Sequence, residues 1–253
     1  MKIELRQKKI TALVIAFNEE KNILGCLESI KWVDEIIVVD SFSTDKTVEL
    51  ARNFTDKVIQ RKWEGFSSQR KFSLEQAGNE WILSLDADER ITDELKNSIL
   101  KIIETDTTYS GFKIARRNYF LGKWIKSAFW YPDHQMRFFR KSKARMEDKL
   151  IHEGFEIDGD VGIIDGDIIH YSYSSLEDAI SKINKYSSLA AKQKADKRVG
   201  VLDIFLRPLS AFITDFISRK GYKDGFHGFL VSWMNSMTTL MTYTKIWERQ
   251  KGS

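Results

Sequence analysis

Short apolar runs alternate with helical patterns at the start of the chain. Residues 10–17 (ITALVIAF) and 35–40 (EIIVVD) are continuous apolar runs that end in polar residues. Such runs are typical of strands buried on both faces of a parallel sheet. Between them, Ile23, Leu27 and Ile30 follow helical spacing, so residues 19–30 predict a helix and the whole stretch a right-handed β-α-β unit.

The same alternation continues to about residue 89. We expect helices at 46–53 and 67–77, a short strand at 58–59, and a strand at 81–85 that ends at an acidic loop. Residues 1–105 therefore predict a doubly wound α/β fold, whose ligands bind outside the carboxyl ends of the strands. The chain has neither a G-x-G-x-x-G nor a P-loop sequence, so glycine-loop phosphate binding is not indicated.

The pattern changes after residue 105. Residues 159–173 (GDVGIIDGDIIHYSY) predict short strands with turns, and residues 176–197 predict a long helix capped by Ser174 or Ser175. An amphipathic helical tail follows, to about residue 248. We predict a catalytic domain over 1–175, with halves 1–105 and 106–175, and a helical extension over 176–253.

Composition narrows the class of protein. The 253 residues carry 40 Lys+Arg, 36 Asp+Glu and 42% hydrophobic residues, a globular composition that excludes disordered chains. The single Cys26 excludes a disulfide framework and a multi-thiolate zinc site. We expect neither a signal peptide nor a membrane span, because the first residues lack an apolar core and no apolar run approaches about 20 residues.

The small net charge of +4 is unevenly distributed. Residues 185–223 hold nine Lys/Arg and three Asp, with apolar residues at helical spacing among them. This pattern is typical of a helix that lies in an anionic membrane interface. The alternative is an ordinary amphipathic helix packed on the domain or on a partner subunit.

Two carboxylates follow the strand at 81–85. Asp86 and Asp88 are separated only by Ala87, and alternate side chains of a strand share a face, so both can reach one ion. Mg²⁺ and Mn²⁺ are commonly held by one or two carboxylates together with substrate phosphates. The alternative for this D-x-D motif is a solvated turn.

Several segments together resemble one enzyme family. They are residues 11–30 (TALVIAFNEEKNILGCLESI), 35–51, 69–89 (which ends in SLDADE), 136–156 and 166–191. In this order they resemble glycosyltransferase family 2, in its lipopolysaccharide core-biosynthesis branch, over about residues 10–195. The resemblance implies the GT-A fold and an inverting, Mg²⁺- or Mn²⁺-dependent transfer of a sugar from a nucleotide-diphospho-sugar to a hydroxyl of a lipid-linked saccharide. Alternatives are another cell-surface polysaccharide or lipid carrier as acceptor, or an inactive membrane-associated scaffold.

The resemblance also implies roles for individual residues. The nucleotide-sugar donor would be bound by Ala16, Asn18, Glu19, Asp40, Arg70, Lys71, Asp86 and Ala87. The metal ion would be bound by Asp86, Asp88 and His170. For Asp40 the alternative is a strand-end turn former, for Arg70 and Lys71 a solvated helix face, and for His170 a packed structural residue.

An inverting transfer needs a general base for the acceptor hydroxyl. In GT-A enzymes this base is the last acid of an x-E-D motif, and the resemblance matches it to residues 151–153 (IHE), which gives Glu153. Residues 146–148 (MED) spell the motif literally, so Asp148 is the alternative.

The acceptor side has weaker signals. Arg137, Arg140 and the aromatic residues 129–131 form a candidate acceptor wall, because arginines bind phosphates and aromatic faces bind sugar rings. The alternative is a packed core with a basic rim.

Other classes fit the chain less well. Nucleic-acid binding would explain the basic segment with its aromatics, but carboxylates at strand ends repel phosphates unless a metal intervenes. A nucleotidyltransferase would show a glycine-rich phosphate loop near the N-terminus, which this sequence lacks. We therefore expect no nucleic-acid partner. The resemblance, with its lipid-linked acceptor, implies a cytoplasmic enzyme that is peripheral on the inner membrane.

Overall fold

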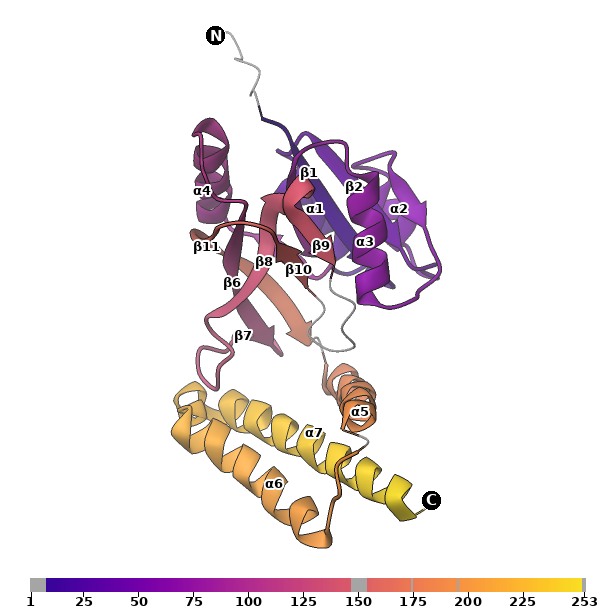
Figure 1. The fold of residues 1–253 in the computed structure, drawn as a ribbon, viewed down its shortest axis with the longest axis vertical. Coiled ribbons are helices and arrows are strands. Elements are labelled where there is room, and N and C mark those ends of the chain that lie inside the picture. Colours follow the sequence, from indigo (N-terminus) through magenta and orange to yellow (C-terminus); the bar gives the residue numbers. More distant parts are fainter. Residues whose placement is uncertain (1–7, 147–153, 174, 195, 252–253) are drawn as a thin grey trace. The chain divides into compact units, whose positions relative to one another are not determined.

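The computed structural model describes residues 8–146, 154–173, 175–194 and 196–251 (Figure 1). The chain divides into two compact units. The first comprises Met1–Arg116 and His134–His170, and the second comprises Arg117–Asp133 and Tyr171–Ser253. The domain boundary at residue 175 stays a prediction, because compactness alone does not decide where a domain ends.

Parallel strands form one part of the sheet in the first unit. They are β1 (Ile10–Ala16), β2 (Glu35–Asp40), β3 (Val58–Gln60) and β4 (Trp81–Asp86). Strand β1 lies between β2 and β4, with Ala16 opposite Asp40 and Ile15 opposite Asp86. The registers bring the carboxyl ends of these strands to one edge, as the sequence predicts.

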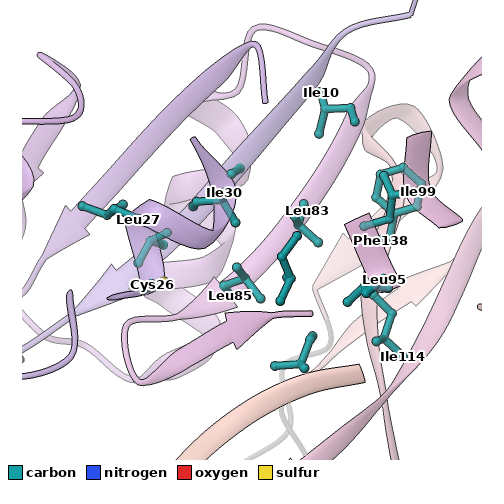
Figure 2. Close-up of a cluster of buried hydrophobic side chains, with 14 of the residues drawn as sticks. Ile10, Cys26, Leu27, Ile30, Leu83, Leu85, Leu95, Ile99, Ile114 and Phe138 are labelled. Atoms are coloured by element: carbon teal, nitrogen blue, oxygen red, sulfur yellow. The ribbon is translucent and has the colours of Figure 1, made fainter. Parts of the chain in front are cut away.

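Helices pack on both faces of these strands. They are α1 (Ile23–Ile30), α2 (Thr47–Ala51), α3 (Phe66–Gln76) and α4 (Asp93–Glu104). Alternate residues of β1 join different cores: Val14 packs with α1 and α4, and Leu13 packs with α3. Figure 2 shows the first of these cores, where Leu27 and Leu83 are fully buried. The predicted doubly wound α/β arrangement is therefore confirmed.

Helix α4 has clear local causes that the sequence analysis did not use. Thr92 caps it, because its side chain accepts a hydrogen bond from the Leu95 amide, and Asp93 and Glu94 stand in the first turn. Its apolar residues Leu95, Ile99 and Ile103 are buried at helical spacing.

The remaining strands either extend this sheet beyond β4 or form a separate pair. They are β5 (Glu89–Ile91), β6 (Gly111–Phe120), β7 (Lys123–Trp124), β8 (Asp133–Arg140), β9 (Ala144–Met146), β10 (Phe155–Ile157) and β11 (Val161–Tyr173), with a 3-10 turn, η1 (Lys141–Lys143), after β8. The sheet order is β3-β2-β1-β4-β8-β6-β11-β5, with β7 beside β6, and β9 and β10 form a separate pair.

The prediction of short strands with turns at residues 159–173 is wrong. One strand, β11, runs through 13 residues. Gly166 has a φ of +97° within it, and a Cβ there would lie 2.4 Å from the Leu95 amide nitrogen. This glycine therefore permits a close approach of α4 to the strand without ending it.

The second unit is mainly helical. It contains α5 (Leu176–Gln193), α6 (Val201–Ile213), a π-helical turn η2 (Thr214–Ser218), a 3-10 turn η3 (Gly221–Asp224) and α7 (Gly225–Lys251). The predicted cap of α5 is confirmed at Ser175, whose side chain accepts from the Asp178 amide. The helix ends at Gln193, earlier than predicted. The helical C-terminal extension is confirmed.

Helices α6 and α7 pack side by side in this unit (Figure 1). Gly228 of α7 packs directly on the turn before it, because a Cβ at this position would lie 1.9 Å from the Gly221 carbonyl oxygen. The Ser236 hydroxyl donates to the Pro208 carbonyl and so ties the two helices together. None of the helices in the described ranges has the length and apolar character needed to cross a membrane.

Candidate functional site

Asp86 lies at the carboxyl end of β4, where two arginines hold it. Nη2 of Arg70 donates to both carboxylate oxygens of Asp86, at 2.9 and 3.0 Å. Nη2 of Arg137 donates to Oδ2 of Asp86 at 2.8 Å. Arg70 comes from α3 and Arg137 from β8, so the first unit assembles this contact from distant parts of the sequence.

Glu89 is a further member of the cluster around Asp86. It is fully buried and accepts from Arg137 at 2.6 Å and from Arg116 at 3.2 Å through Oε1. Its other oxygen accepts from the Asp86 amide at 3.0 Å. Asp86 and Glu89 thus face three arginines, and Asp88 stands beside them as a third carboxylate. Arginines grouped in this way are typical of sites that receive an anionic group.

The electrostatics follow from this arrangement. Burial works against ionised Asp86, but the charges of Arg137 and Arg70 outweigh it and hold the pKa of Asp86 well below its usual range. Burial likewise opposes the charge on Arg137, and Asp86 and Glu89 raise its pKa nonetheless. Both groups are therefore ionised at neutral pH.

Cys26 of α1 lies behind the cluster. Its thiol is fully buried and donates weakly to the Asp86 carbonyl, with 3.6 Å between sulfur and oxygen. Burial raises the pKa of Cys26, and the nearby carboxylates of Glu89, Asp88 and Asp86 raise it further. A buried neutral thiol is unreactive, so Cys26 has a packing role.

Asp88 and His170 meet beside the arginine cluster. Oδ2 of Asp88 lies 3.4 Å from Nε2 of His170, and both side chains are partly exposed. Strand β11 brings them together, because His170 is paired with Glu89 in its register with β5. A carboxylate and an imidazole at this distance are suitable ligands for a divalent cation.

The donor set fits a metal that also binds substrate. Among the described residues, no three His, Cys, Asp or Glu side chains gather closely enough to hold an ion by themselves. Mg²⁺ and Mn²⁺ sites, however, often use one or two protein ligands and complete the coordination with phosphate oxygens and water. Asp88 and His170 fit this type of site. Asp86 gives both of its oxygens to arginines, and its metal role stays a prediction.

Asp40 organises the loop after β2. Its buried carboxylate accepts from the Ser43 hydroxyl, from the Ser43 amide at 2.9 Å and from the Gln60 side chain at 3.2 Å. Asp40 therefore has the turn-forming role that the sequence left open, and its donor-binding role stays a prediction.

Two exposed aromatic rings flank this edge. Phe17 follows β1 and Phe42 follows β2, and each is more than half exposed. Asn18 fixes the loop between them, because its side-chain oxygen accepts from the Thr44 amide at 2.8 Å. Asn18 and Phe42 both have positive φ angles, 54° and 59°. The loop thus presents flat apolar faces where a base could stack.

Two further hydrogen bonds hold the loop after β1 against the loop after β2. The Glu19 amide donates to the Thr47 hydroxyl at 2.7 Å, and the Glu20 amide donates to Asp45 at 3.1 Å. Although burial acts in the opposite direction, hydrogen bonds from Thr47 and Glu20 hold the pKa of Asp45 below its usual range. These contacts tie the backbone at Glu19 and Glu20 to the side chains of Thr47 and Asp45.

Other predicted site residues are placed as follows. Ala16 is buried at the end of β1, and Ala87 is buried with its amide donating to the Ile15 carbonyl. Lys71 is exposed on α3. The candidate bases Glu153 and Asp148 lie outside the described residues. The roles that the sequence suggests for these residues stay predictions.

The two arginines of the predicted acceptor wall make contacts within the protein. Arg137 is buried against Asp86 and Glu89, and Arg140 stacks on the Trp81 ring and donates to the Thr107 carbonyl. Both have structural contacts, which agrees with the alternative of a packed core.

Sequence reasoning missed Glu89 and Arg116 entirely. Glu89 directly follows the D-x-D motif, and a carboxylate next to such a motif was the only signal. Arg116 gave none, because its contact with Glu89 spans 27 residues of the chain.

Comparison with known proteins identifies a family and several relatives. The profile of Glycosyl transferase family 2 matches residues 11–160. The lipopolysaccharide core biosynthesis glycosyltransferase LpsC of Rhizobium meliloti (strain 1021) is 28% identical over 249 residues, which cover 95% of this chain and 92% of LpsC. The uncharacterized glycosyltransferase RT0209 of Rickettsia typhi is 29% identical, over 95% of this chain and 87% of its own length.

Among solved structures, glucosyl-3-phosphoglycerate synthase from Mycobacterium tuberculosis, in complex with Mg²⁺ and uridine diphosphate, is similar to part of the chain. The identity is 23%, the match covers 44% of each chain and the TM-score is 0.39.

Proposed function

Because the chain belongs to glycosyltransferase family 2, and is therefore a glycosyltransferase, we propose the reaction that it catalyses. It moves a sugar from a nucleotide-diphospho-sugar to a hydroxyl of a lipid-linked saccharide, with inversion and with Mg²⁺ or Mn²⁺. The observation that carries this proposal is the Asp86 cluster with the Asp88–His170 pair beside it. Together they offer positive charge and metal ligands at one strand end.

The donor diphosphate is the group that needs this environment. When the glycosidic bond to the diphosphate breaks, negative charge grows on the departing oxygens, and fixed positive charge stabilises it. Arg70 and Arg137 keep Asp86 ionised and place two guanidinium groups at the end of β4. A divalent ion held by Asp88 and His170 would supply further stabilisation of that leaving group.

Asp86 itself has a second task in this proposal. Three arginine hydrogen bonds occupy most of the acceptor positions of its carboxylate, while its side chain stays 21% exposed. One remaining lone pair can accept a hydrogen bond from a donor hydroxyl. We therefore expect Asp86→Asn to weaken donor binding while the affinity for Mn²⁺ alone changes little. A large loss of Mn²⁺ affinity would instead make Asp86 a metal ligand.

The nucleoside lies, in this proposal, along the edge formed after β1 and β2. The exposed Phe17 and Phe42 rings would flank the base, and the loop fixed by Asn18 and Asp40 would hold the rest. Rigid loops bind with less loss of conformational entropy, so the hydrogen bonds within the loop favour donor binding even where they do not touch it.

Our proposal for the acceptor draws on the name of one relative. The name of LpsC states lipopolysaccharide core biosynthesis, and the match with LpsC extends over nearly the whole of both chains. We propose a lipopolysaccharide core saccharide, reached at the cytoplasmic face of the inner membrane. A different lipid-linked polysaccharide, or a scaffold without activity, are the outcomes that a transfer assay would separate from it.

The general base of this reaction is Glu153, with Asp148 as the alternative. Glu153→Gln removes the base without removing the donor site, so turnover should fall by about 10²- to 10⁴-fold while donor affinity changes less than about twofold. Transfer from a panel of nucleotide-sugars to lipopolysaccharide core acceptor measures turnover, and calorimetry measures affinity. The matched variant is Asp148→Asn. If it stops turnover and Glu153→Gln does not, the base is Asp148.

A further inference from the structure

Helix α6 exposes an apolar face. We define the α6 face as the exposed apolar side chains Val201, Leu202, Phe205, Leu206, Leu209, Ile213 and, in η2, Ile217. Leu202 is 73% and Phe205 is 68% exposed, whereas Pro208 is the buried residue of the helix. An amphipathic helix normally turns such a stripe toward a core, so this face is adapted to something other than water.

Aromatic rings continue the face beyond α6. Phe212 and Phe216 lie 5.6 and 6.0 Å from Phe229 of α7, measured between ring centroids. Phe229 stacks on Phe226, which is 69% exposed, and Phe216 also contacts Tyr222 of η3. Ring contacts therefore link the end of α6 and η2 to η3 and to the start of α7.

Positive charge stands at both ends of this surface. Arg198 precedes α6, and Lys220 and Lys223 follow η2; all three side chains are exposed. Lys220 has a left-handed backbone, with a φ of 59°, in the turn between η2 and η3. Lys223 follows in η3, so both lysines lie in one short stretch.

Three of the acidic residues nearby are buried or paired, and the fourth, the exposed Asp196, stands between the exposed Lys194 and Arg198. Asp215 is buried and engages Arg219 and Asn235, and Asp224 is buried and accepts from the Ser127 hydroxyl. Asp203 pairs with Arg207 along α6. The surface that meets solvent is therefore apolar with a cationic rim.

We propose that the α6 face, with Phe226 and Phe229, docks the protein on an anionic bilayer. The apolar side chains enter the boundary between headgroups and acyl chains, and Arg198, Lys220 and Lys223 contact anionic headgroups. A second copy of the chain fits less well, because two such faces would bring the same cations together. The proposal narrows the basic segment 185–223: residues 185–193 lie in α5 and are not part of the face.

Docking goes beyond the proposed function and does not depend on it. A lipid-linked acceptor would be presented at the same surface, but the bilayer would bind this face without donor, acceptor or metal. Vesicle binding and donor hydrolysis can thus fail separately, and each failure points to one proposal only.

The experiment is flotation of the full chain with two kinds of vesicle. One kind contains phosphatidylglycerol in phosphatidylcholine, and the other contains phosphatidylcholine alone. We expect clear binding to the anionic vesicles, reduced by high salt. Phe205→Glu with Leu209→Glu should weaken it at least about tenfold. The matched control is Ile180→Glu, an equally exposed apolar residue on α5, which should bind as the wild type does.

Two further variants, Lys220→Glu and Lys223→Glu, test the contribution of the cations. We expect each to weaken binding to the anionic vesicles by about fivefold or more. Donor hydrolysis in detergent should stay at the wild-type level in every variant, which shows that the first unit is intact. The proposal is overturned if wild-type protein does not float, or if Phe205→Glu with Leu209→Glu floats as well as Ile180→Glu. It is also overturned if the double variant only converts a dimer into a monomer, as measured by light scattering.

Discussion

The Asp86 cluster buries charged side chains, whereas the α6 face exposes apolar side chains to solvent. In the cluster, Glu89 is fully buried and Arg137 is 4% exposed, although both carry charge. On the α6 face, Leu202 and Phe205 are more than two-thirds exposed, although both are apolar. Neither arrangement is the one that stability alone would favour.

The two regions differ in how the unfavourable burial of charge or exposure of apolar surface is compensated. Buried charges in the cluster are compensated inside the protein, because each carboxylate has at least two charged or backbone donors. Among the residues of its unit that the structure describes, the apolar face has no such partner. Removing a side chain from the cluster should therefore harm the fold, whereas removing one from the face should harm only an interaction with something outside the chain.

The largest effect is expected for Arg137→Met. Methionine keeps much of the apolar volume but leaves Asp86 and Glu89 short of their shared cation, so the free energy of unfolding should fall by about 3–5 kcal/mol. Urea denaturation followed by circular dichroism measures the change. Arg198→Met, at an exposed arginine, is the matched control. A loss below about 1 kcal/mol for Arg137→Met would mean that the cluster is not the compensated network described above.

Acid should weaken the cluster in a defined pH range. The pKa of Asp86 is lower in the folded chain than its unfolded value of about 3.9, because of Arg137 and Arg70. Its contribution to stability is therefore complete above about pH 5 and is lost as the pH falls below that. The free energy of unfolding, measured from pH 2 to 6, should depend less steeply on pH in Asp86→Asn than in the wild type.

The control for this slope is Asp165→Asn, since Asp165 is exposed on β11. It should leave the slope as it is in the wild type. Equal slopes for Asp86→Asn and the wild type would contradict the charge pairing of Asp86.

The smallest effect is expected on the apolar side of the comparison. Leu202→Ser removes a large apolar group that meets solvent, so the free energy of unfolding should change by less than about 0.5 kcal/mol. The same denaturation experiment measures it. A cost above about 2 kcal/mol would show that Leu202 is packed against another part of the chain and would remove it from the α6 face.

The sequence was sufficient for the parts of the fold with local causes. The apolar runs of β1, β2 and β4 predict those strands to within a residue, because strands buried on both faces have a continuous apolar sequence. The Ser175 cap likewise predicts the start of α5. Helix α4, which was not among the expected helices, has equally local signals at Thr92 and Leu95.

The site could be predicted only where the motif is local. Asp86 and Asp88 stand next to each other in a recognisable pattern, but the partners of Asp86 do not. Arg137 reaches Asp86 across 51 residues because β8 pairs antiparallel with β4, and no local pattern sets that register. Short strands with turns were expected at 159–173, because the sequence does not show that Gly166 faces the backbone of α4.

The most direct test of the central claim is calorimetry of nucleoside diphosphate binding. A panel of nucleoside diphosphates is titrated into the full chain with Mn²⁺ and, separately, with excess chelator. The account predicts that at least one binds with Mn²⁺, that chelator weakens it at least about tenfold, and that Asp88→Asn does the same while Asp165→Asn does not. Equal affinity in chelator, or in Asp88→Asn, would contradict a metal-assisted diphosphate site at the end of β4.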